Sequence, residues 1–140
     1  MIQNAEQPPQ GKAPGTGASA PEEAKDEPST LNLAAQAKGE QEFERATRSY
    51  EEGAYRNAAR QFQAALDLGL RTKADQVTAH KYLAFINCVS GREKACRDEF
   101  RKALEVDPGF ELAPAEIGHP IWGPVFRSVK AEAAAKVKAK

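Results

Sequence analysis

Two cysteines are the residues whose type and spacing most readily suggest chemistry in this 140-residue chain. Cys88 and Cys96 lie on either side of a Gly-Arg turn in the stretch YLAFINCVSGREKACRDEF. The pair has four interpretations: a redox centre, half of a metal site, a disulfide bond, or two small core residues. A metal site needs about four ligands, and a thioredoxin-type centre places its cysteines much closer together at one helix start. Redox and metal chemistry are therefore disfavoured, whereas a disulfide and two buried thiols both remain open.

The two histidines give no support for catalysis. His80 and His119 are far apart in the chain, no H-E-x-x-H motif or glycine-rich phosphate loop occurs, and the serines lack the context of a nucleophile elbow. We interpret His80 as a half-exposed or packing residue and His119 as part of a turn before Pro120. The sequence therefore predicts a protein that is not an enzyme and that needs no metal or cofactor.

Charge and hydropathy argue against a nucleic-acid-binding protein and against a membrane-spanning one. The chain has 20 basic and 20 acidic side chains, so no overall field favours nucleic acid. The main apolar cluster, residues 82–86, is far shorter than the roughly 18 residues that span a bilayer. Residues 1–12 lack the basic and apolar regions of a signal peptide. We expect a soluble chain, whose membrane attachment would require a lipid anchor that this sequence does not contain.

Residues 1–31 differ in composition from the rest of the chain. They hold most of the nine prolines and no aromatic residue. Such a segment cannot bury enough apolar surface to offset the conformational entropy that ordering removes. We therefore predict a disordered linker over residues 1–31, which would suit a tether.

From Asn32 onward, apolar residues recur at every third or fourth position, which predicts an all-α fold. The pattern predicts helices over residues 32–50, 55–68, 73–90 and 93–106. Glycines mark the predicted helix ends, and Asp107-Pro108 ends the fourth helix because the position before proline disfavours helical geometry.

An internal repeat with a period of 38 residues aligns GAYRNAARQFQAALDLGL with GREKACRDEFRKALEVDP. The aligned pairs include Gly53 with Gly91, Ala58 with Cys96, and Phe62 with Phe100. Small side chains let two antiparallel helices approach closely, while the phenylalanines fill the wider space beside that contact. The pattern resembles the tetratricopeptide repeat, a two-helix unit with a usual period of about 34 residues.

The resemblance implies two helical hairpins over residues 32–108, with LRTKADQ lengthening the link between the repeats. Because a stack of repeats needs covered ends, residues 109–140 are expected to form a C-terminal cap. In this cap, Pro124 would open a helix. The side chains expected to cover the second repeat are Phe110, Leu112, Ile121 and Trp122.

The repeat frame brings the two cysteines together. Cys96 takes the close-contact position that Ala58 holds in the first repeat, and Cys88 lies one turn beyond Ala84 on the facing helix. A disulfide and two free buried thiols that act as small hydrophobic residues both fit this frame. An oxidised pair would indicate export to the periplasm, because cytosolic thiols stay reduced.

In the tetratricopeptide family, the first helix of each hairpin lines the concave binding face. The residues that the resemblance assigns to this face are Phe43, Thr47, Tyr50, Thr78, Lys81 and Phe85. Aromatic rings suit a peptide groove, and Lys81 suits an acidic or C-terminal group of the peptide. The alternative is that the aromatic residues only pack between the repeats.

The end of the second repeat and the segment after it resemble the tails of bacterial cell-envelope repeat proteins, and in particular the TssQ-like lipoproteins associated with type VI secretion. The resemblance implies a non-enzymatic interaction module with a protein or peptide partner, tethered in the periplasm or at the outer membrane. The alternative is a cytoplasmic tetratricopeptide scaffold or adaptor that self-associates.

Overall fold

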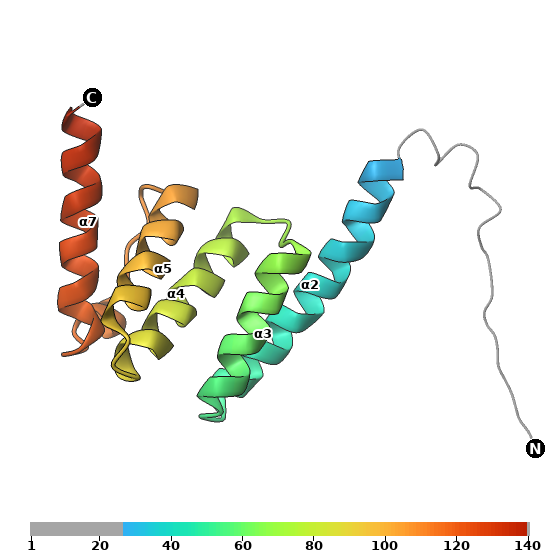
Figure 1. The fold of residues 1–140 in the computed structure, drawn as a ribbon, viewed down its shortest axis with the longest axis horizontal. Helices are drawn as coiled ribbons and strands as arrows, with labels where there is room; N and C mark the ends of the chain where they lie inside the picture. Colours follow the sequence, from blue (N-terminus) through green and yellow to red (C-terminus); the bar gives the residue numbers. More distant parts are fainter. Residues whose placement is uncertain (1–26, 140) are drawn as a thin grey trace, which may run out of the picture. The chain divides into compact units, whose positions relative to one another are not determined.

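The computed structural model describes residues 27–139, with side chains over residues 33–137. Within this range every regular element is an α-helix, as the sequence predicts (Figure 1). Residues 35–140 form one compact unit. The predicted disorder of residues 1–26 lies outside the described residues. The helices are α2 (Glu27–Glu51), α3 (Tyr55–Leu68), α4 (Lys73–Val89), α5 (Glu93–Val106), α6 (Pro114–Ile117) and α7 (Trp122–Ala139).

Helix α2 differs from the prediction at its start, whereas helix α4 does not. Helix α2 begins at Glu27 rather than Asn32, so residues 27–31 are helical and not disordered. Helix α4 begins at Lys73, as predicted, and the Thr72 Oγ1 caps it by accepting a hydrogen bond from the Asp75 backbone N–H at 3.0 Å. Residues 73–76 of LRTKADQ therefore belong to α4, and only residues 70–72 belong to the link between the repeats.

The same turn closes two antiparallel hairpins, α2–α3 and α4–α5 (Figure 1). Gly53 and Gly91 have φ values of 83° and 82°, in the left-handed region that glycine adopts readily. In the first turn the Ala54 N–H donates to the Ser49 carbonyl at 2.8 Å, and in the second the Arg92 N–H donates to the Asn87 carbonyl at the same distance. The repeat found in the sequence is therefore also a repeat of the backbone.

Each hairpin is packed around small side chains. Ala46 and Ala58 in the first hairpin, and Ala84 and Cys96 in the second, have no exposed surface. Gly39 has a similar role where α2 crosses the end of α3, since a Cβ there would lie 2.5 Å from the Gly69 carbonyl oxygen. Close approach of the paired helices thus depends on residues that have little or no side chain.

The hairpins meet through aromatic rings. One apolar cluster belongs mainly to α2, α3 and α4, and the other to α4, α5 and the C-terminal segment. Tyr50 and Tyr82 pack against both clusters. The Tyr82 ring centroid lies 4.4 Å from that of Tyr50 and 5.3 Å from that of Phe62. These offset and tilted rings hold the two hairpins together.

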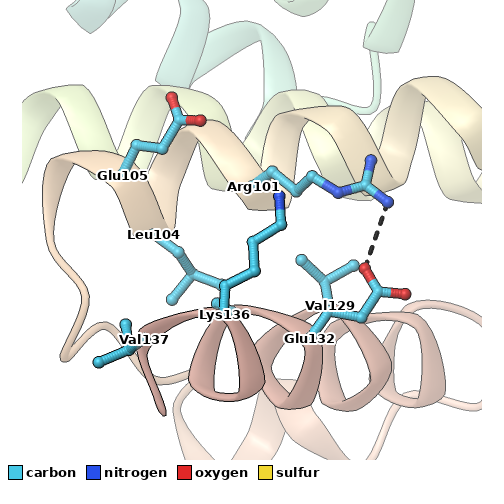
Figure 2. Close-up of a pocket in the computed structure, with 8 residues that line it drawn as sticks. Arg101, Leu104, Glu105, Val129, Glu132, Lys136 and Val137 are labelled. Atoms are coloured by element: carbon cyan, nitrogen blue, oxygen red, sulfur yellow. Dashed lines mark hydrogen bonds and ion pairs between the residues drawn. The ribbon is translucent and has the colours of Figure 1, made fainter. Parts of the chain in front are cut away.

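The C-terminal segment covers the second hairpin, as predicted. Leu112, Phe126 and Val129 are buried against α4 and α5. Helix α7 runs parallel to α5, since Arg97 contacts Ser128 at 3.1 Å and Arg101, one turn later, pairs with Glu132 at 3.3 Å (Figure 2).

Two details of the predicted cap are wrong. The Ile121 side chain is 48% exposed and does not cover the second repeat. Helix α7 begins at Trp122, so Pro124 lies inside its first turn and does not open it. Among the described residues, none of the helices is sufficiently long and apolar to cross a membrane.

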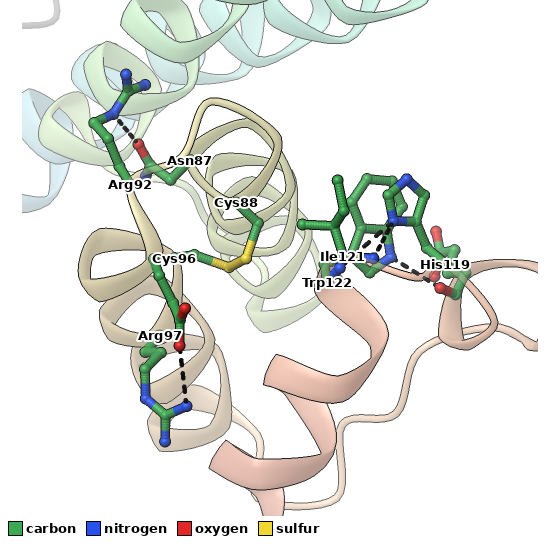
Figure 3. Close-up of a disulfide and its surroundings, with 10 residues drawn as sticks. Asn87, Cys88, Arg92, Cys96, Arg97, His119, Ile121 and Trp122 are labelled. Carbon is green, nitrogen blue, oxygen red and sulfur yellow. Dashed lines mark hydrogen bonds and ion pairs between the residues drawn. A yellow bond between two sulfur atoms is a disulfide. The ribbon is translucent and has the colours of Figure 1, made fainter.

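The cysteine sulfur atoms lie at bonding distance, 2.02 Å apart, and the Cα atoms are separated by 5.1 Å (Figure 3). The bond joins the last turn of α4 to the first turn of α5 across the Gly91 turn. Both residues are buried, Cys96 completely. The proximity expected from the repeat frame is therefore confirmed, and the geometry is that of a disulfide.

Gly123→Ala tests the close approach of α7 to α6. A Cβ at this position would overlap the Ile117 carbonyl oxygen, whereas a Cβ at Gly118 meets nothing within 4 Å. We expect Gly123→Ala to lower the free energy of unfolding by about 1–3 kcal/mol in urea. The matched control Gly118→Ala should change it by no more than about 0.5 kcal/mol. Equal stability of the two variants would contradict this packing.

Reduction tests the cysteine bond. Closing so short a loop should stabilise the fold by about 2.5 kcal/mol through the entropy of the unfolded chain. Urea unfolding with and without reductant should show this difference for the wild type. A Cys88→Ala, Cys96→Ala double variant should show none, and thiol alkylation in denaturant without reductant, followed by mass spectrometry, should label neither cysteine.

Candidate functional site

The six residues expected on the concave face do not form one groove. The half-buried Phe43 ring lies 5.8 Å from Phe62 and packs within the first hairpin. The Thr47 hydroxyl donates to the Phe43 carbonyl at 3.0 Å, within its own helix. The alternative interpretation, packing within the repeats, therefore describes Phe43 better than a binding role.

Lys81 is paired within the chain. Its Nζ lies 2.8 Å from Glu116 Oε2, and the lysine side chain is only 15% exposed. The same ammonium lies 4.7 Å from the centroid of the Tyr82 ring, which adds a cation–π contact. Helix α6 thus supplies the carboxylate that the sequence analysis expected from a peptide.

Thr78 lies apart from the other candidates. It lines a cavity of about 590 Å³ between the start of α4 and the end of α5, together with Val106 and Phe110. This cavity contains none of the five other predicted residues. Thr78 is therefore not part of a surface shared with Tyr50 or Phe85.

Tyr50 and Phe85 do come together, in a hollow of about 260 Å³ that we call the aromatic hollow. It is formed by the ends of α2 and α4, the start of α3, and the segment that leads into α7. Histidine is the only side chain in its lining that can carry a positive charge. The lining residues are Tyr50, Tyr55, Phe85, Ile86, Val89, His119 and Trp122.

One wall of the aromatic hollow is a stack of three rings. The Trp122 ring lies 3.8 Å from that of Phe85, with 10° between the planes, and 3.6 Å from that of His119, with 7° between the planes. The Trp122 Nε1–H donates to the Glu116 carbonyl at 2.8 Å. The stack and this hydrogen bond fix the tryptophan rigidly.

His119 is oriented by the start of α7 (Figure 3). Its Nδ1 accepts the Ile121 backbone N–H at 3.1 Å. In the neutral ring the proton is therefore on Nε2, which leaves an N–H donor beside the hollow. His119 thus lies in a turn, as interpreted from the sequence, and it also contributes to the hollow.

The rim of the hollow carries exposed apolar surface. The Tyr55 and Val89 side chains are 44% and 42% exposed. Neither residue was predicted, because Tyr55 begins the second helix of its hairpin and Val89 lies at the end of α4, beyond the residues assigned to the concave face. The sequence feature that could have indicated them is an apolar side chain at a predicted helix end, next to the turn glycine Gly53 or Gly91.

Burial raises the pKa of Tyr50 to about 12, and the neighbouring Tyr55, Tyr82 and Glu116 add to this increase. The phenol is therefore neutral at physiological pH and can donate or accept a hydrogen bond. Among the described residues, no group of three or more His, Cys, Asp or Glu side chains could hold a metal ion. The hollow is chemically suited to bind an apolar group beside a few hydrogen-bonding groups.

No family model, curated protein or solved structure matches this chain. The class of the protein therefore rests on its own architecture, an all-α, helical-repeat-like fold of two hairpins and a cap.

Alkaline titration tests the surroundings of Tyr50. The native state keeps a phenolic proton that the unfolded chain loses at a pH near 10, so native stability should fall as the pH rises from about 10 towards 12. We expect ultraviolet absorbance to show phenolate formation with a midpoint near pH 12, and Tyr50→Phe should abolish that step and reduce the alkaline loss of stability. A step unchanged in Tyr50→Phe would contradict the assignment.

Proposed function

We propose that this chain is a non-enzymatic protein-interaction module whose aromatic hollow binds an apolar side chain of a partner peptide. The observation that carries the proposal is the combination of a rigid ring stack at Trp122 with exposed apolar side chains, Tyr55 and Val89, on the rim. Such pockets bury an anchor residue with little loss of conformational entropy, because the walls are already ordered.

As part of this proposal, we regard the two hairpins as repeats of the tetratricopeptide type. The repeated glycine turn, the buried small residues and the C-terminal cap support that identification. In this type of protein the aromatic hollow would be one end of the concave face, from which Lys81 is withdrawn by its pairing with Glu116.

We further propose that the module works in the bacterial envelope, as an accessory protein of a multiprotein assembly such as a type VI secretion system. The cysteine pair at bonding distance supports an oxidising compartment. The proline-rich composition of residues 1–26 supports a tether, and the resemblance to TssQ-like lipoproteins suggests the assembly. Tethering would raise the effective concentration of the module near its partner.

Selection of peptides from a random displayed library against the full chain tests the function. Trp122 is the only tryptophan, so a peptide in the aromatic hollow should change its fluorescence. We expect Val89→Glu, which introduces a charge into the apolar rim, to weaken binding of a selected peptide about tenfold or more. Circular dichroism should show unchanged helicity.

Val137→Glu is the matched control, since Val137 is also an exposed valine near a helix C-terminus and lies outside the hollow. It should leave binding of the selected peptide unchanged. Equal binding to both variants would contradict the proposal. Concentration-dependent dimers in light scattering that Val89→Glu abolishes would instead favour the self-associating scaffold, for which the exposed Tyr55, Val89 and Ile121 side chains are the motivation.

A further inference from the structure

A second apolar surface lies between α5 and α7, as a cavity of about 210 Å³ that we call the α5–α7 groove (Figure 2). Leu104 from α5 and Val129, Ala133 and Val137 from α7 are the apolar residues of its lining. It shares no lining residue with the aromatic hollow.

The groove is bridged towards the start of the helices and exposed towards their C-terminal ends. Arg101 reaches across it from α5 to pair with Glu132 of α7 at 3.3 Å (Figure 2). Arg97 pairs with the same carboxylate group at 2.6 Å. One to two turns further along, the Val137 side chain is 70% exposed. The apolar lining of the groove is therefore open to solvent at this end.

The two walls carry opposite charges where the groove is exposed. Glu105 belongs to α5 and its carboxylate points away from α7, whereas Lys136 belongs to α7 and its side chain extends towards α5 (Figure 2). Among the described residues, neither takes part in an ion pair within 4.0 Å. One helical turn beyond Arg101 and Glu132, no ion pair between described side chains joins α5 to α7 across the groove.

We propose that the α5–α7 groove binds an amphipathic α-helix of a partner protein. A third helix is the element that packs between the ridges of two parallel helices. Its apolar stripe would cover Leu104 and Val137, with a basic residue beside Glu105 and an acidic residue beside Lys136. The mixed signs of the walls argue against an anionic membrane surface, which would select for cations alone.

A partner helix and a second copy of this chain differ in what fills the groove. A second copy would have to insert its own α7 into the groove, because an isologous interface uses the same surface of both copies. A ridge of side chains, such as a single helix presents, is the shape that complements this surface.

Three stapled helical peptides with a common apolar stripe test the proposal. The flanks of the stripe carry lysine on one side and glutamate on the other in the mixed peptide, lysine on both sides in the basic peptide, and glutamate on both sides in the acidic peptide. The mixed peptide satisfies both walls in one of its two orientations along the groove, and it is free to adopt that orientation. Fluorescence anisotropy with the full chain at low ionic strength measures each affinity.

We expect the wild type to bind the mixed peptide about threefold more tightly than either of the others, the range of an exposed ion pair. Lys136→Glu should shift the preference to the basic peptide, and Glu105→Lys to the acidic one. Val137→Glu should weaken all three about tenfold, whereas Val89→Glu in the aromatic hollow should change none.

Failure of all three peptides to bind, or binding without any charge preference, would overturn the proposal. Loss of binding in Val89→Glu but not in Val137→Glu would assign the peptides to the aromatic hollow instead. Dimers of the wild type that Val137→Glu dissociates would show that a second copy occupies the groove. Because Glu105 and Lys136 are exposed, their variants should fold normally, as circular dichroism will verify.

Discussion

The close approach of paired helices at small side chains is the constraint on which the rest of this structure depends. Ala46, Ala58, Ala84 and Cys96 leave no room between the helices of each hairpin. Large rings therefore lie beside these close contacts, and Tyr82 and Trp122 lie at the joint between the hairpins and at the cap. The aromatic hollow follows from this distribution, because the turns that close the hairpins leave the ends of these joints uncovered.

Much of the fold could be predicted because it depends on interactions between residues close in sequence. Apolar periodicity located α3, α4 and α5, and the repeated glycines located the turns that bring the cysteines together. The start of α2 could not be predicted in this way, since Pro28 reads as part of a proline-rich linker although it lies in the first helical turn. The start of α4 at Lys73, in contrast, agrees with the prediction, and the Thr72 side chain caps it.

The candidate site was less predictable because an irregular segment completes it. Residues 107–121 contain only the short helix α6 and have no periodicity to interpret. Yet Glu116 of this segment pairs with Lys81, so the expected cation is not available on the concave face. The same segment also orients His119 beside the hollow. The repeat alignment could identify Tyr50 and Phe85. It could not predict that His119 and Trp122 of the C-terminal segment line the same hollow.

Tyr50 belongs both to the joint between the hairpins and to the lining of the aromatic hollow. Any occupant of the hollow therefore touches a residue on which the docking of the first hairpin depends. Opening of that hairpin would disrupt the site, so occupancy and hairpin docking are thermodynamically linked. A bound partner would suppress the local opening of α2 and α3, and amide exchange in those helices would slow even though most of their residues never meet the ligand.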